Sequence, residues 1–175
     1  QVWITGITGR GDRLMRLISC TIENFGKLNN VTYDFTNDCN TICEDNGWGK
    51  STLASFIRVM FFGFKNETKK KLVDKERNRL MPWQKGVYGG EIVFEANGIV
   101  YSLRRTFGKK QADDEFLLRR KDTNMECDDF SSEIGEELFK IDAQSFERTV
   151  FIGQSDCVTA TTDSINAKIG NLADN

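Results

Sequence analysis

The sequence predicts an α/β fold, and three stretches of the chain carry that prediction. A strand-like segment leads into the glycine-rich loop "EDNGWGKS", residues 44–51, and an amphipathic segment follows it. Asn97-Gly98 separates two segments rich in β-forming residues, which is the strongest short signal for a hairpin. Ser131 then opens a segment with apolar residues at helical spacing. In a chain of 175 residues these features indicate one α/β lobe with an added antiparallel sheet.

Composition is that of an ordinary globular protein, with 39% hydrophobic and 29% charged residues, a net charge of -2 and one proline. The chain contains no apolar run long enough for a transmembrane helix and no signal-peptide pattern at its start. We therefore expect no membrane association and a cytoplasmic location.

The cysteines and the missing histidine restrict the possible chemistry. There are five cysteines without a CxxC pair and no histidine that could complete a zinc site, and the absence of histidine excludes a His-based triad. We interpret the cysteines as reduced and structural. Any reaction must use lysine, hydroxyl, amide or carboxylate groups, or a bound metal.

Residues 1–14, "QVWITGITGRGDRL", do not share the pattern that follows, so we interpret them as a leader outside the fold. A purine-rich tract such as a ribosome-binding site, read in frame, would encode "GRGD", and Met15 would then be the natural start. The alternative is a short ordered extension. The predicted lobe spans residues 15–175.

From Met15, apolar residues alternate through "MRLISCTIENFGKL" and "NNVTYDF", which predicts two strands with Asn29-Asn30 as their turn. A third short strand is expected at Thr41 to Cys43, directly before the glycine loop. After the loop, one apolar face repeats at spacings of three and four residues, which predicts a helix; its members are Leu53, Phe56, Ile57, Met60, Phe61 and Phe64.

The loop fits the P-loop (Walker A) pattern G-x-x-x-x-G-K-[ST] except at its first position. Backbone N–H groups of Asn46, Gly47, Trp48 and Gly49 could turn inward around phosphate oxygens, beside the positive end of the helix dipole. Lys50 would then reach the β and γ phosphates, Ser51 would bind Mg²⁺, and Thr52 would bond to the α phosphate. The alternative is a glycine-rich helix entry with a chance lysine.

Glu44 occupies the first loop position, where the pattern has glycine. Its carboxylate would repel a triphosphate unless it points away, so we expect weakened affinity with the phosphate cradle intact. Trp48, the variable position before Gly49, could cover the phosphates or lie at an interface, and we favour the interface.

The middle and end of the chain supply the added sheet and two helices. Strands are predicted at Tyr88 to Ala96, Ile99 to Phe107 and Asp114 to Arg120. A capped helix should begin at Ser131, and a second short helix, "DAQSFERTV", should lead into residues 151–154.

Three motifs carry a resemblance. "MRLISCTIENFGKLNNVTYDF", "NGWGKST" and "VFIGQSD" together resemble the N-terminal half of the ATPase head in SMC-like proteins, the SbcC, RecN and RecF relatives within the ABC class of AAA family ATP-binding proteins. The resemblance implies bound ATP and Mg²⁺. It maps the glutamine that helps hold Mg²⁺ and the attacking water onto Gln154, and a basic nucleotide contact onto Lys27. The alternatives are that Gln154 is a surface amide and that Lys27 is a solvated turn lysine.

The resemblance also implies what ATP hydrolysis by this chain would require. Lys50 and Gln154 would be its catalytic residues, yet no signature helix and no Asp-Glu strand end occur in these 175 residues. ATP hydrolysis would therefore require the C-terminal half of the same head and a head–head dimer, in a parent protein acting on DNA in maintenance, repair or defence. The alternative is a truncated, non-hydrolysing nucleotide-binding module. A small-molecule P-loop kinase is disfavoured because a hairpin, not a parallel strand, follows the first helix.

The segment from Lys65 to Lys85 is locally basic, with eight basic and three acidic residues. Such a patch could contact DNA phosphates, but a solvated loop is the more common explanation. Trp83 follows Pro82 at its end, and we interpret it as a packed anchor, with stacking on a base as the alternative.

Overall fold

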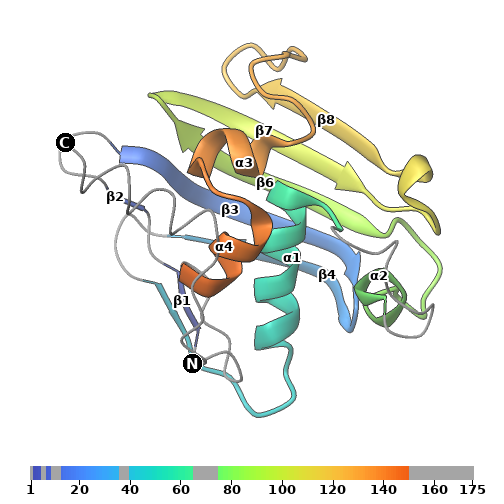
Figure 1. Cartoon of the computed structure of the whole chain (residues 1–175). Coiled ribbons are helices and arrows are strands. Elements are labelled where there is room, and N and C mark those ends of the chain that lie inside the picture. The colour runs from blue at the N-terminus through green and yellow to red at the C-terminus, as the bar shows by residue number, and fades with distance from the viewer. Residues whose placement is uncertain (1, 5–6, 9–12, 36–39, 65–74, 150–175) are drawn as a thin grey trace.

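A computed structural model describes residues 2–4, 7–8, 13–35, 40–64 and 75–149 of the chain. It contains a twisted antiparallel sheet with helices packed on one face (Figure 1). The sheet follows the order β2-β3-β6-β7-β8, and β4 pairs with β3 beside this path. Every strand pair within the described residues is antiparallel. The combination of this sheet with packed helices confirms the predicted α/β class.

The long strand β3 (Arg13–Phe25) is central, since it pairs with β4 (Leu28–Asp34) and with β6 (Gly89–Ala96). Its hairpin with β4 turns at Gly26 and Lys27, where Gly26 has φ 57. The prediction that Asn29-Asn30 forms this turn is wrong: Asn29 pairs with Asn24 inside the ladder. Alternation of Cys20 and Ile22 into the core fixes the register, because a slip of one residue would expose both.

The predicted hairpin lies where the sequence indicates. β6 pairs with β7 (Ile99–Thr106) from Gly89↔Thr106 to Ala96↔Ile99, and Asn97 and Gly98 take φ 52 and 78. Positive φ at both turn residues matches the right-handed twist of the strands, which explains the Asn-Gly pair. β8 (Glu115–Arg120) extends the sheet after a short 3₁₀ turn, η3 (Gln111–Asp113).

Helix α1 (Lys50–Phe62) packs against β3, β6 and β7 and carries the centre of the core. Phe56 is fully buried and lies edge-on to Phe25, with ring centroids 5.3 Å apart. Burying a side chain of this size stabilises the fold by about 1.5–3 kcal/mol. All six residues of the predicted apolar face pack into the core, although Phe64 follows the end of the helix.

The helices α3 (Ile134–Phe139) and α4 (Ala143–Thr149) pack beside α1, as Figure 1 shows. α3 begins three residues after the predicted start. Ser131 instead accepts a hydrogen bond at Oγ from the N–H of Glu133, 3.1 Å away, in the turn before the helix. The close approach of α3 to α1 depends on Gly135, because a Cβ there would lie 2.7 Å from the Phe62 ring.

The short helix α2 (Glu76–Arg79) is fixed by Arg77, whose side chain is 2% exposed. Its guanidinium donates to both carboxylate oxygens of Asp114, at 2.6 and 2.8 Å, and lies 4.7 Å from the Phe64 ring centroid. A bidentate pair of this kind is both strong and specific in direction. Arg77 therefore joins α2 to the start of β8.

Short strands also pair parts of the first fourteen residues with the fold. β1 (Val2–Ile4) pairs with β5 (Asn40–Ile42), and β2 (Ile7–Thr8) pairs with β3. These pairings do not test the interpretation of residues 1–14 as a leader. That interpretation stays a prediction. Within the part of the chain that the structure describes, no helix has the length and apolarity to cross a membrane.

Candidate functional site

The glycine loop, residues 44–49, joins β5 to the N-terminus of α1. Gly49 takes φ 124 as the N-cap of the helix, and no side chain of the described residues caps the helix there. Gly47 has φ 90, and a Cβ built on it would meet nothing within 4 Å. Both glycines therefore hold conformations that other residues rarely adopt, beside a helix end whose first N–H groups have no side-chain acceptor.

Lys50 folds back over this loop. Its Nζ donates to the backbone oxygens of Glu44 at 2.5 Å and of Asp45 at 3.0 Å. The bonds use carbonyl groups only, so the loop can hold the ammonium whatever side chain occupies position 44. The carboxylates of Glu44 and Asp45 belong to exposed residues. An ammonium held in this way lies close to the N-terminus of α1.

Lys27 reaches the same place from the β3–β4 turn. A Cβ built on Gly49 would lie 3.1 Å from Cε of Lys27 and 3.0 Å from Cδ2 of Leu28. The turn also touches the helix, since a Cβ on Gly26 would lie 2.9 Å from Cγ2 of Thr52. The structure therefore brings Lys27 to the glycine loop and the first turn of α1, although β4 and β5 separate them in the sequence.

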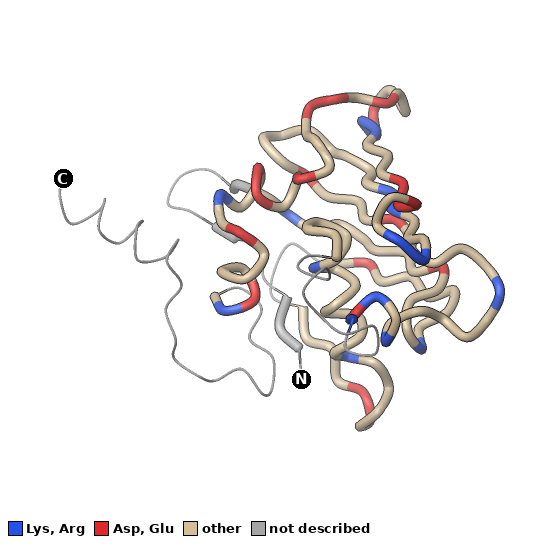
Figure 2. The backbone as a smooth tube through the Cα atoms, turned by 45° about the vertical axis from the view of Figure 1, so that its right-hand side comes forward, with Lys and Arg blue, Asp and Glu red and all other residues tan. Residues whose placement is uncertain are grey.

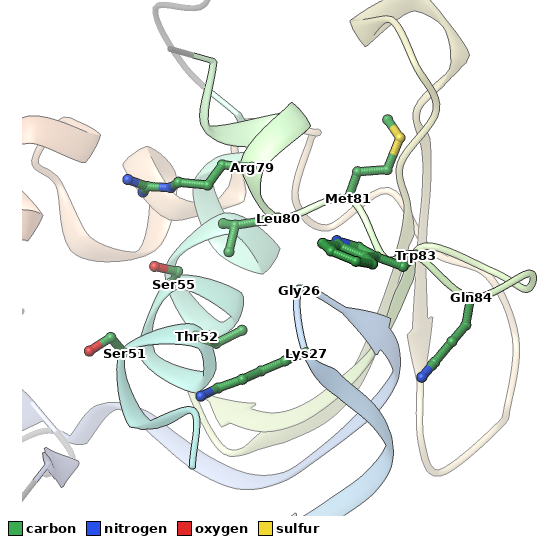
Figure 3. A pocket seen from close by; sticks show the side chains of 10 residues that line it. All are labelled: Gly26, Lys27, Ser51, Thr52, Ser55, Arg79, Leu80, Met81, Trp83 and Gln84. Atoms are coloured by element: carbon green, nitrogen blue, oxygen red, sulfur yellow. The ribbon is translucent and has the colours of Figure 1, made fainter. Parts of the chain in front are cut away.

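A cavity of about 710 Å³ opens beside these residues (Figure 3). One end is polar, and its side chains come from the β3–β4 turn, α1 and α2: Lys27, Ser51, Thr52, Ser55 and Arg79. The other end is formed by the segment after α2, with Leu80, Met81, Trp83 and Gln84. Sequence reasoning missed Ser55, Arg79, Leu80, Met81 and Gln84. The unusual "LMPWQ" run after α2 could have indicated Leu80, Met81 and Gln84, although its link to the loop depends on the fold.

Trp48 and Asn46 have different surroundings within the loop. Trp48 is half-buried, and its ring lies edge-on to Tyr33 with centroids 5.8 Å apart, so it packs on β4. Asn46 is exposed. The hydroxyl of Tyr33 is buried without a hydrogen-bond partner among the described residues, and burial raises the pKa of this phenol.

The basic segment is only partly described. Residues 65–74 lie outside the described part, as does Gln154, so the structure does not place Gln154 relative to Lys50. Arg77 is buried on Asp114, so it belongs to the core. Figure 2 shows basic and acidic residues interspersed along the described backbone. Trp83 is 98% exposed, and its interpretation as a packed anchor is wrong.

Comparison with known proteins places this arrangement in a family. The family described as AAA domain matches residues 19–174, which include the loop, the cavity and the added sheet. The chain is also similar to Uncharacterized protein YhaN of Bacillus subtilis (strain 168), with 39% identity over 90 residues. That alignment covers 51% of this chain and 8% of YhaN, so the chain matches a small part of the relative's length. The chain belongs to the SMC/SbcC-like AAA domain family.

Proposed function

We propose that this chain is the ATP-binding half of an SMC-like ATPase head, a P-loop lobe of the ABC type. The observation that carries the proposal is the convergence of Lys50, Lys27 and the uncapped N-terminus of α1 beside one cavity. Backbone N–H groups, a helix dipole and two ammonium groups are the features that bind polyphosphates.

The residues present fit a nucleotide with its metal. The first turn of α1 contains no acidic residue, so nothing on the helix opposes an anion at its N-terminus. Ser51 is exposed there, and Thr52 lines the cavity. Bound Mg²⁺ would neutralise phosphate charge, and Ser51 and Gln154 would hold it. Asn46, Gly47 and Gly49 would contact phosphate oxygens through their N–H groups. The N–H of Trp48 would join them by leaving the Asp45 oxygen, to which it donates at 3.2 Å.

Lys50 has to exchange partners when ATP binds. Its ammonium would leave the carbonyls of Glu44 and Asp45 for the β and γ phosphates, trading neutral acceptors for charged ones. Lys27 would add a second positive charge from the β3–β4 turn. Both interactions exist in the bound ground state, so their loss should appear chiefly as lost affinity.

Calorimetry with Mg-ATP tests the site. We expect the chain to bind in the micromolar to millimolar range, roughly -4 to -8 kcal/mol, and Lys50→Ala to remove binding. Lys109→Ala is the matched control, because Lys109 is exposed in the β7–β8 connection and does not line the cavity. Equal ATP binding by the wild type and Lys50→Ala would refute the site.

We further propose that the parent protein works in the cytoplasm, that its heads dimerise around ATP with the C-terminal half of each head completing the site, and that it acts on DNA. The basic segment supports the DNA role.

Changing Lys69, Lys70 and Lys71 to glutamate should weaken duplex binding equally across sequences and reduce its salt dependence. Unchanged binding at low salt would leave the segment as a solvated loop.

A further inference from the structure

We propose that the segment from Leu80 to Gln84 is the base-binding wall of the cavity and that the Trp83 indole stacks on the base of the bound nucleotide. This inference rests on the proposed function and extends it to a part of the cavity that the phosphate-binding loop does not reach. Three observations support it: the position of the wall in the cavity, its hydrogen bonds to the rest of the fold, and the exposure of Trp83.

The wall lies next to the phosphate-binding end of the cavity. Gly26 stands between the two ends: a Cβ there would lie 2.9 Å from Cγ2 of Thr52 and 3.4 Å from Cδ2 of Leu80. Figure 3 shows Lys27 and Ser51 at one end of the cavity and Met81 and Trp83 at the other. In this proposal, a nucleotide with its phosphates at α1 extends its base past Gly26, towards this wall.

The wall is anchored to the fold on both sides. The N–H of Gly26 donates to the Leu80 oxygen at 2.7 Å, which joins the wall to the β3–β4 turn. The Tyr88 hydroxyl donates to the Arg77 oxygen at 3.1 Å, and Tyr88 itself is buried. Leu80 is 8% exposed. The chain is thus held at Leu80 before Trp83 and at Tyr88 after it.

Trp83 is the exception in this anchored segment, because its side chain is 98% exposed. An indole has a large apolar face, and leaving it in water forgoes the free energy that burial would provide. Stacking on a base would cover that face, and every base offers a π surface for it. Gln84, which also lines the cavity, offers an amide donor and acceptor for the edge of the base. Purines, with the larger ring, should stack best.

Comparing ATP with inorganic tripolyphosphate tests the base wall, since the two share their phosphates and differ in the nucleoside. The wild type should bind Mg-ATP more tightly than Mg-tripolyphosphate. Trp83→Ala should weaken ATP binding by about fivefold to a hundredfold and leave tripolyphosphate binding unchanged. Trp83→Phe, which keeps a π face, should recover most of the ATP affinity.

Met125→Ala is the control, because Met125 is also an exposed apolar residue, at 67%, but does not line the cavity. It should bind both ligands like the wild type. ATP affinity unchanged in Trp83→Ala, or an equal loss for ATP and tripolyphosphate, would overturn the base wall. A wild type that binds neither ligand would instead refute the proposed phosphate site, so the two failures are distinguishable.

Discussion

At the residue scale, the backbone and the side chain of Glu44 have to be considered separately. Lys50 uses the backbone oxygen of Glu44, and this bond survives a change of side chain. The carboxylate belongs to an exposed residue beside the proposed phosphate position, where its repulsion is screened by salt. We therefore expect the Glu44 carboxylate to change the affinity for nucleotide without forming part of the phosphate-binding loop.

We expect Glu44→Gln to tighten Mg-ATP binding severalfold at low salt, because the amide keeps the shape and removes the charge. The gain should shrink as ionic strength rises. Calorimetric titrations at several salt concentrations measure it, with Glu126→Gln as a control for an exposed carboxylate outside the cavity. Equal affinities at every salt concentration would show that the Glu44 carboxylate points away from the phosphates.

Cys20 gives a second prediction at this scale. It is fully buried in β3, and burial raises the pKa of its thiol from 9.0 to about 12. The folded protein keeps this thiol protonated, whereas the unfolded chain ionises it above pH 9. The stabilisation is present below pH 9 and is lost as pH rises towards 12. At pH 10.5 the loss amounts to about 2 kcal/mol.

Urea unfolding of the wild type and Cys20→Ala at pH 8 and pH 10.5 measures this effect. The variant should be less stable at pH 8, because it leaves a cavity, and should lose less stability on going to pH 10.5. Parallel losses in the two proteins would mean that other groups cause the alkaline destabilisation.

At the scale of elements, α2 and the start of β8 are held together by one ion pair. Arg77 is almost completely buried against Asp114 and Phe64, so removing it leaves a carboxylate that has lost its bidentate partner. Because α2 leads into the wall at Leu80, the same pair also positions one side of the cavity.

We expect Arg77→Ala to lower the free energy of unfolding by about 3–5 kcal/mol. Arg119→Ala, which breaks the more exposed pair with Glu126, should cost about 1 kcal/mol or less. Denaturant titration of both variants gives the comparison. If both cost the same, Arg77 does not hold α2 to β8.

At the scale of the whole molecule, binding and chemistry should separate between two residues. Lys50 is proposed to contact charge that is already present in bound ATP, whereas Gln154 is proposed to orient Mg²⁺ and water as the bond breaks. In a complex with the C-terminal half of the head, Lys50→Ala should lose affinity. Gln154→Ala should keep its affinity and lose turnover by on the order of a hundredfold.

Steady-state hydrolysis and equilibrium binding of the two variants test this separation. Turnover at the wild-type rate in Gln154→Ala would remove Gln154 from the site. It would also remove the argument that "GQSD" corresponds to the glutamine motif of an ABC head.

The sequence by itself determined the local elements and the family. Asn97-Gly98 specified its hairpin because both residues adopt positive φ readily, and the apolar spacing of Phe56 and Met60 specified α1. The glycine loop with Lys50 could also be predicted, because its residues are consecutive in the sequence.

Only the tertiary structure decided which distant residues meet. The sequence predicted a turn at Asn29-Asn30, but pairing of β3 with both β4 and β6, with Cys20 and Ile22 in the core, places it at Gly26-Lys27. That choice places Lys27 over Gly49 and Gly26 against Leu80. In the basic segment from Lys65 to Lys85, Arg77 is buried against Asp114 and Phe64, whereas Trp83 is exposed. Such outcomes depend on long-range packing, on which local sequence patterns carry no information.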